Sequence, residues 1–123
     1  MAGHNELGEW GENIAREYLM GQGYTVLDKN THIGHKEIDI IAIKGIRMVF
    51  VEVKTRTSGI EEALDAVDNK KIRRMVKAAD SFMQRYTAPY EYQFDIIAIA
   101  VKPDGTYIIE HFPDAFFPPL NGC

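Results

Sequence analysis

Cysteine is almost missing from this chain of 123 residues, because the single one, Cys123, is the last residue. One thiol excludes a disulfide framework and a cysteine-based zinc site within a single chain. No apolar run approaches the roughly 20 residues that a membrane-spanning helix needs. The first residues show no basic region followed by an apolar run, so no signal peptide is expected. We therefore expect a cytoplasmic protein with no membrane partner.

An excess of basic residues is also lacking, since 14 Lys and Arg face 18 Asp and Glu, for a formal net charge of −4. That balance does not by itself indicate a nucleic-acid binder. A charged face depends, however, on how charges are distributed rather than on their sum. Hydrophobic residues make up 46% and charged residues 26%, which is typical of a soluble globular protein. The length fits a single domain over residues 1–123.

Hydrophobic periodicity and glycine-containing breaks divide the chain into helices and strands. Two runs rich in Ile and Val flank a turn at residues 44–47, which predicts a β-hairpin. A long helix follows, and its passage to a buried apolar strand predicts a crossover between parallel strands. The expected fold class is α/β, a mixed β-sheet flanked by helices. The predicted elements are a helix at Glu6–Gln22, strands at Tyr24–Leu27, Glu37–Ile43, Met48–Arg56, Gln93–Val101 and Thr106–Phe112, loop or strand edge at residues 28–36, and a helix at Ile60–Tyr86 that could break near Val67–Asn69.

Three charged side chains interrupt the hairpin strands, where few charges are expected. Along the second strand, side chains alternate, so Glu52 and Lys54 point to the face opposite Val53. Asp39 lies on the adjoining strand, which predicts that two carboxylates and one ammonium meet at one edge of the sheet. Buried charges are usually paired or bind a metal. A structural ion pair is the commoner reason for an isolated Glu-x-Lys, and the preceding acid favours a functional site.

The most basic stretch of the chain lies on the long helix. Its apolar stripe includes Met75 and Phe82, Lys71 falls on the flank of that stripe, and the side chains roughly opposite it are Lys70, Arg74 and Lys77. A solvated helix face and a phosphate-binding face explain such a cluster about equally well. The basic residues of this helix are Lys70, Lys71, Arg73, Arg74 and Lys77.

Other polar residues are expected to have structural or surface roles. His32 and His35 lie in a polar stretch, where surface histidines are commoner than metal ligands. Asp95 opens its strand and is expected to cap or pair locally. The tail at Phe112–Leu120 is apolar without periodicity and is expected to cover the core or to form a partner surface.

A combination of motifs then gives a resemblance over about residues 8–116. A helix with Gly-x-x-Gly-Glu-x-x-Ala at residues 8–15 precedes Glu-Ile-Asp at 37–39, Phe-Val-Glu-Val-Lys-Thr-Arg at 50–56, a helix with Lys71 and Arg74, and Phe-Asp at 94–95. This set resembles the YraN-like family of small bacterial proteins, which is similar to Holliday-junction resolvases and PD-(D/E)XK nucleases. The resemblance implies a restriction-endonuclease-like fold. Two departures are Lys36, where the family usually has Gly, and Gln93, where it often has Arg.

The resemblance also implies roles for individual residues. Asp39 matches the first acid of the nuclease motif, and Glu52 and Lys54 match its Glu-x-Lys. Glu12 matches the helix glutamate of the resolvases, and these four are the expected catalytic residues. Asp39, Glu52 and the backbone carbonyl of Val53 are the expected ligands of Mg²⁺ or Mn²⁺, which prefer oxygen donors. The expected nucleic-acid contacts are Arg56, Lys70, Lys71, Arg74 and Lys77.

The function that follows is metal-dependent hydrolysis of DNA phosphodiester bonds, with branched structures as one expected substrate. Phosphate contacts carry no sequence information, so structure-selective or non-specific cutting is expected. The analogy with resolvases adds a homodimer, because a junction presents paired strands. Two alternatives stay open: a weakly active or inactive nucleic-acid-binding module on the same fold, and an interaction protein whose charged cluster is only an ion network.

Overall fold

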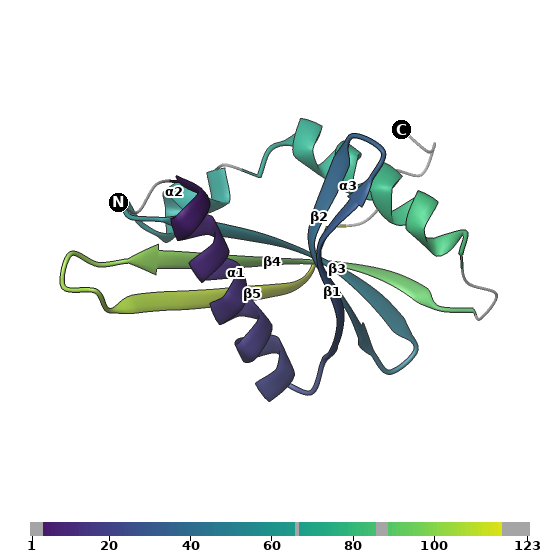
Figure 1. Ribbon diagram of the computed structural model, residues 1–123, viewed down its shortest axis with the longest axis horizontal. Helices are drawn as coiled ribbons and strands as arrows, with labels where there is room; N and C mark the ends of the chain where they lie inside the picture. Colours follow the sequence, from purple (N-terminus) through teal and green to yellow (C-terminus); the bar gives the residue numbers. More distant parts are fainter. Residues whose placement is uncertain (1–3, 66, 86–88, 117–123) are drawn as a thin grey trace.

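A computed structural model describes residues 4–65, 67–85 and 89–116. Five strands form one sheet in the order β1-β2-β3-β4-β5 (Figure 1). The β3–β4 pair is parallel and the other three pairs are antiparallel. The elements are α1 (His4–Gly21), β1 (Thr25–Ile33), β2 (Lys36–Lys44), β3 (Arg47–Arg56), α2 (Ile60–Asp65), α3 (Asn69–Met83), β4 (Glu91–Val101) and β5 (Tyr107–Phe116).

The central part of the sheet agrees with the sequence prediction. The hairpin joins β2 and β3, and the connection through α2 and α3 returns the chain to a parallel β4. The helical segment breaks before Asn69, where Asp68 caps α3 by accepting a 2.9 Å hydrogen bond from the backbone N–H of Lys71. This mixed sheet flanked by helices confirms the α/β class and is consistent with a restriction-endonuclease-like arrangement.

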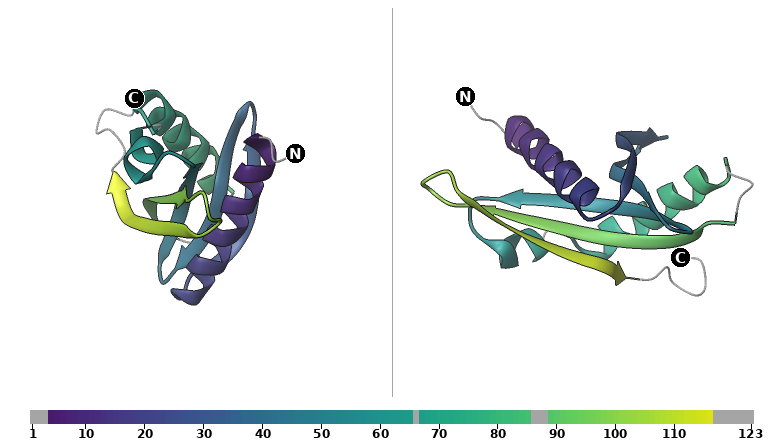
Figure 2. Two further views of the ribbon diagram at one scale, coloured as in Figure 1. Left: turned by 90° about the vertical axis from the view of Figure 1, so that its left-hand side faces the viewer. Right: turned by 90° about the horizontal axis from the view of Figure 1, so that it is seen from below.

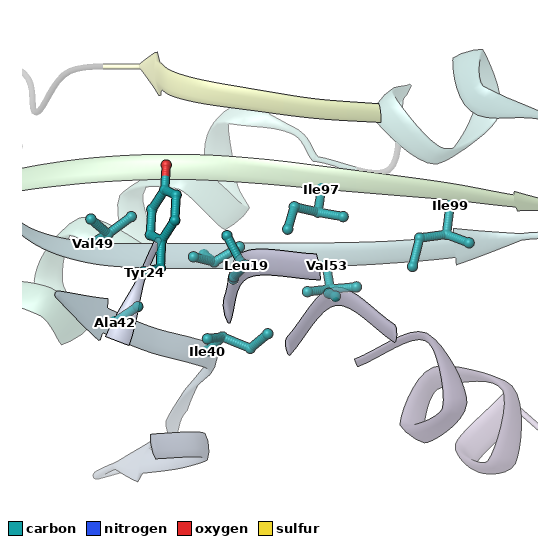
Figure 3. Packing of buried hydrophobic residues seen from close by; sticks show 10 residues of the cluster. Leu19, Tyr24, Ile40, Ala42, Val49, Val53, Ile97 and Ile99 are labelled. Carbon is teal, nitrogen blue, oxygen red and sulfur yellow. The ribbon is translucent and has the colours of Figure 1, made fainter. Parts of the chain in front are cut away.

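Helices cover both faces of the sheet, with α1 on one face and α2 and α3 on the other (Figure 2). Between α1 and the sheet, the side chain of Leu19 from α1 forms a buried cluster with those of Val49, Val53 and Ile97 from the strands (Figure 3). On the opposite face, Phe50 packs edge-on against Phe82 of α3 with ring centroids 6.0 Å apart. The predicted alternation along β3 is therefore correct, since consecutive residues belong to different cores.

Both outer strands are longer than predicted. β1 continues through the stretch predicted as loop or strand edge, and β5 continues beyond Phe112 to Phe116. Most residues of these strands are exposed or half-buried, because neither strand has a neighbour on its outer side. Their sequences therefore lack the apolar alternation that marks a half-buried strand. The remainder of the predicted tail, and Cys123, lie outside the described residues.

In the part of the chain that the structure describes, no helix is long and apolar enough to cross a membrane.

Candidate active site

The site is built where β2 and β3 separate. Their pairing ends at Ile40 and Val51. Two residues further along β3, the backbone N–H of Val53 donates a 2.8 Å hydrogen bond to Asp39 Oδ2. A carboxylate thus takes the place of a cross-strand carbonyl, and Asp39 is only 7% exposed. The separation of the strands fixes the first acid beside the strand that carries the second.

Glu52 is the most deeply buried acid of the site, with 1% exposure. Its Oε2 atom lies 3.2 Å from Lys54 Nζ and 3.5 Å from Lys71 Nζ. Its other oxygen, Oε1, is buried and has no hydrogen-bond partner among the described residues. A buried carboxylate oxygen without a partner is costly, so Oε1 is a natural point of attachment for a ligand.

An open cavity of about 250 Å³ joins these groups. Asp39, Glu52, Lys54 and Lys71 all line it. The predicted convergence of two acids and one lysine is therefore seen, and the lysine does not close the cavity. Further predicted residues also line the cavity, namely Glu12 from α1 and Val53 and Arg56 from β3.

Burial and mutual repulsion make the acids of this cavity reluctant to be charged together. Burial, followed by the negative charges of Glu52 and Glu12, raises the pKa of Asp39 to about 8, against the opposing hydrogen bond from Val53 and the charge of Lys71. Burial also raises the pKa of Glu12, although the side chain of Asn30 hydrogen-bonds to it and lowers the pKa in part. A bound cation would relieve both costs.

The donors present suit a hard divalent cation. Mg²⁺ is usually held by one or two carboxylates and keeps several waters. Asp39 and Glu52 supply two carboxylates to one cavity, and Glu52 Oε1 has no other partner within the described residues. No group of three or more His, Cys, Asp or Glu side chains in the described part of the chain is placed to hold a metal. The residues therefore fit a water-rich Mg²⁺ or Mn²⁺ site and not a closed cage.

The basic residues of α3 fall into different places. Lys71, expected on the flank as a phosphate contact, lies inside the cavity against Glu52. Arg74 lines a neighbouring cavity, whereas Lys70 and Lys77 are exposed and line neither cavity. On β3, Arg56 lines the acid cavity while its Nη1 donates a 2.8 Å hydrogen bond to the carbonyl of Thr55. Of the basic residues predicted to contact nucleic acid, Lys71 therefore contacts the buried acid Glu52 directly.

A third buried acid, Asp95, lies under α1 on the other face of the sheet. Its carboxylate accepts hydrogen bonds from Tyr24 Oη (3.1 Å), Gln93 Nε2 (2.8 Å) and the backbone N–H of Asp114 (2.9 Å), and it lies 2.7 Å from His111 Nε2. Burial alone would raise the pKa of Asp95, but the contacts with His111, the backbone N–H of Asp114 and Gln93 outweigh burial and lower it. Asp95 was predicted to pair locally, and this is correct only for its contact with Gln93. The contacts of Asp95 with Tyr24 and His111 join distant parts of the chain, so no local sequence pattern predicts them.

These observations define the class of protein: a mixed α/β sheet flanked by helices, with two buried acids and two lysines around a cavity where strands separate. Residues 11–99 match the model of the uncharacterised protein family UPF0102, and the chain belongs to this family. A UPF0102 protein of Parabacteroides distasonis is 44% identical over 122 residues, which cover 98% of this chain and 100% of the relative. One of Flavobacterium psychrophilum is 42% identical over 118 residues, with 95% and 98% covered. UPF0102 is the YraN-like family that the sequence motifs resemble, so the resemblance to that family is confirmed.

Proposed function

We propose that this protein is a metal-dependent nuclease that hydrolyses DNA phosphodiester bonds. The observation that carries the proposal is the meeting of Asp39, Glu52 and Lys54 in one open cavity, with one buried oxygen of Glu52 lacking a partner among the described residues. An ion pair alone would need neither the second acid nor the opening. Family membership adds no activity, because the family is uncharacterised.

Asp39, Glu52 and the backbone carbonyl of Val53 would hold Mg²⁺ or Mn²⁺ in this proposal. When bound, such an ion would acidify a coordinated water and neutralise charge on the phosphate. Lys54 reaches the same cavity and orients or deprotonates the attacking water, or stabilises the negative charge that develops. Glu12 completes the acidic cluster. The ammonium groups of Lys54 and Lys71, which lie against Glu52, balance the negative charge of the acids while no cation is bound.

The substrate is held through its phosphates. Arg56 and Arg74 lie beside the acid cavity, and Lys70 and Lys77 extend the basic surface along α3. Such contacts position a strand without reading its sequence. We therefore propose structure-selective or non-specific cutting, with branched DNA as one substrate and a homodimer as the form that meets paired strands.

A cleavage panel tests this function. The purified protein is incubated with plasmid, branched DNA and RNA in Mg²⁺, Mn²⁺ or a chelator. Products should require metal and disappear in Asp39→Ala and Lys54→Ala, whereas Lys102→Ala, in the exposed β4–β5 turn, should cut normally. Cutting that survives both site variants, or no cutting of any substrate, would contradict the proposal.

A second candidate is a catalytically weak or inactive nucleic-acid-binding module. It is favoured by one observation, because both lysines contact the same oxygen of Glu52 and partly neutralise the site without metal. Salt-sensitive DNA binding without cleavage under any metal would identify this alternative. Absence of salt-sensitive binding would instead leave an ion network in an interaction protein.

The proposed homodimer has a test of its own. Light scattering with and without branched DNA measures whether a dimer forms.

A further inference from the structure

A second and larger cavity adjoins the acid cavity. It has a volume of about 470 Å³, and the two cavities share Glu37 and Lys71. The turn between β1 and β2 reaches toward α3 and forms one wall (Figure 1). The lining residues are His35, Lys36 and Glu37 from that turn and the start of β2, and Lys71, Arg74 and Met75 from α3.

The charges of this cavity are mainly positive. Lys36, Lys71 and Arg74 contribute three cations. The single acid of the lining, Glu37, is exposed, and its Oε2 atom lies 3.4 Å from Nε2 of His32, a residue that does not line the cavity. Within the part of the chain that the structure describes, neither Lys36 nor Arg74 has an ion-pair partner. Two cations from different elements therefore face a common space in which Glu37 is the one acid of the lining.

The floor of the cavity strengthens this effect. Met75 is only 1% exposed and belongs to the apolar core beneath α3. Charges beside an apolar wall are screened less than charges surrounded by water. An arginine also presents paired N–H donors that match two oxygens of a phosphate. The arrangement thus favours a phosphate group over a simple halide.

We propose that this second cavity is a phosphate-binding subsite, in which Lys36 and Arg74 hold the nucleic-acid phosphate that neighbours the scissile one. The inference rests on the proposed nuclease function and adds the path of the strand. Lys71 lies on the border of both cavities, so a strand bound across them has one phosphate on each side of that residue. The β1–β2 turn is then a positioning element for the substrate, and Lys36 is a contact that a glycine could not make.

Binding without chemistry is the first test. Fluorescent single-stranded and branched DNA are titrated in a chelator at several salt concentrations, using the wild type and Lys36→Gln/Arg74→Gln. The double variant should bind at least tenfold more weakly, and the slope of log affinity against log salt should fall by about 0.7 to 0.9, which corresponds to one lost phosphate contact. The variant Lys36→Arg/Arg74→Lys, which keeps both positive charges, should retain most of the affinity of the wild type.

A matched control removes the same charges elsewhere. Arg85 follows the end of α3 and Lys102 lies in the β4–β5 turn; both are exposed, and neither lines either cavity. Arg85→Gln/Lys102→Gln should change affinity less than twofold. If it weakens binding as much as Lys36→Gln/Arg74→Gln, the effect is one of net charge and the subsite is wrong. Equal melting temperatures of the variants show that folding is unchanged.

Further outcomes separate the subsite from the nuclease function. If the wild type binds and cuts DNA while Lys36→Gln/Arg74→Gln behaves like the control, the subsite is overturned and the function stands. If the wild type neither binds nor cuts, both are overturned. Inorganic phosphate and a phosphorylated dinucleotide are compared as competitors. Stronger competition by the dinucleotide supports a nucleic-acid strand running across the two cavities. Equal competition would mean that the larger cavity binds a free anion, and it would overturn the proposed subsite.

Discussion

Asp39 and the backbone of Val53 are joined by a 2.8 Å hydrogen bond just beyond the last paired residues of β2 and β3. This bond ties the first acid to the strand that carries Glu52. The sheet thus holds the carboxylate of Asp39, whereas the side chains of Lys54 and Lys71 contact that of Glu52. A carboxylate held in this way would be preorganised for the cation proposed above, and without a cation it is repelled by the charge of Glu52.

Replacing Asp39 by Asn should stabilise the metal-free protein. The Asn side chain keeps an acceptor for the N–H of Val53 and removes the repulsion with Glu52. We expect the melting temperature in a chelator at pH 8.5 to rise by a few degrees, since roughly 1 kcal/mol corresponds to about 3–6 °C in a domain of this size. Differential scanning calorimetry measures it, and an equal or lower melting temperature would contradict the repulsion.

The same residue gives a pH dependence with a defined sign. The pKa of Asp39 is raised from 3.8 to about 8 in the folded protein, so the folded state holds this proton more tightly than the unfolded state. Its stabilising effect is complete below about pH 4 and is lost as the pH rises toward 8. The stability of metal-free wild type should therefore fall between pH 5 and pH 8 more steeply than that of Asp39→Asn. Parallel curves would show that Asp39 does not carry this proton.

Divalent metal should stabilise the wild type but not Glu52→Gln. A ligand present at 100 times its dissociation constant adds about 2.7 kcal/mol to the free energy of unfolding. The Gln side chain has nearly the same shape and lacks the charge that attracts the cation, so the gain in melting temperature with Mn²⁺ should largely vanish. Ca²⁺ is included because it tests binding without supporting the same chemistry. A full metal response in Glu52→Gln would exclude this carboxylate as a ligand.

Gly11 is required by a close approach of α1 to the sheet. A Cβ atom at this position would overlap the hydroxyl of Thr55, whereas nothing lies within 4 Å of a Cβ at Gly8. Gly11→Ala should destabilise the protein by about 1–3 kcal/mol, and Gly8→Ala, in the same helix, should be neutral or stabilising by up to about 1 kcal/mol. Urea unfolding measures both. Thr55→Ala should restore much of the loss in the double variant, and strictly additive effects would contradict the contact.

Asp95 should be essential for stability rather than for chemistry. Asp95→Ala leaves His111, Tyr24 and two further donors without their buried acceptor, so a loss of roughly 3–5 kcal/mol is expected. Tyr24→Phe removes one hydrogen bond and should cost about 1 kcal/mol. Because the pKa of Asp95 is lowered by folding, its contribution is present above its ordinary pKa and disappears on acidification. Acid unfolding of Asp95→Asn should be less steep than that of the wild type, and identical profiles would contradict this assignment.

The sequence is informative where strands are buried and where one hairpin carries the candidate site residues. The Ile and Val runs predict β2 and β3 because both strands are enclosed by neighbours and cores. The meeting of Asp39, Glu52 and Lys54 was predictable from the hairpin, but its exact register was not, and the separation of the strands beyond Ile40 and Val51 sets the position of Asp39. The helix break near Asn69 is visible because Asp68 is a good N-cap.

Contacts between distant segments were not predictable. The position of Lys71 depends on how α3 lies on the sheet, so periodicity places it only on the flank of the stripe. Asp95 and Asp39 look alike in sequence, each within an apolar strand. In the structure both satisfy a backbone N–H at an irregularity of the sheet, Asp114 at a β-bulge and Val53 at the strand separation. Only the surroundings distinguish them, because His111 and Tyr24 enclose one and an open cavity borders the other.

The early end of β2–β3 pairing has a consequence for divergence within the family. The tip of the β1–β2 ribbon around Gly34 contributes no pairing to β3, so its length and composition can change while the paired strands keep their register. The rim of the larger cavity can thereby vary while the paired part of β2 and β3 stays the same. If the protein is the nuclease proposed above, exchanging this tip between relatives should transfer substrate preference without rebuilding the interior of the molecule.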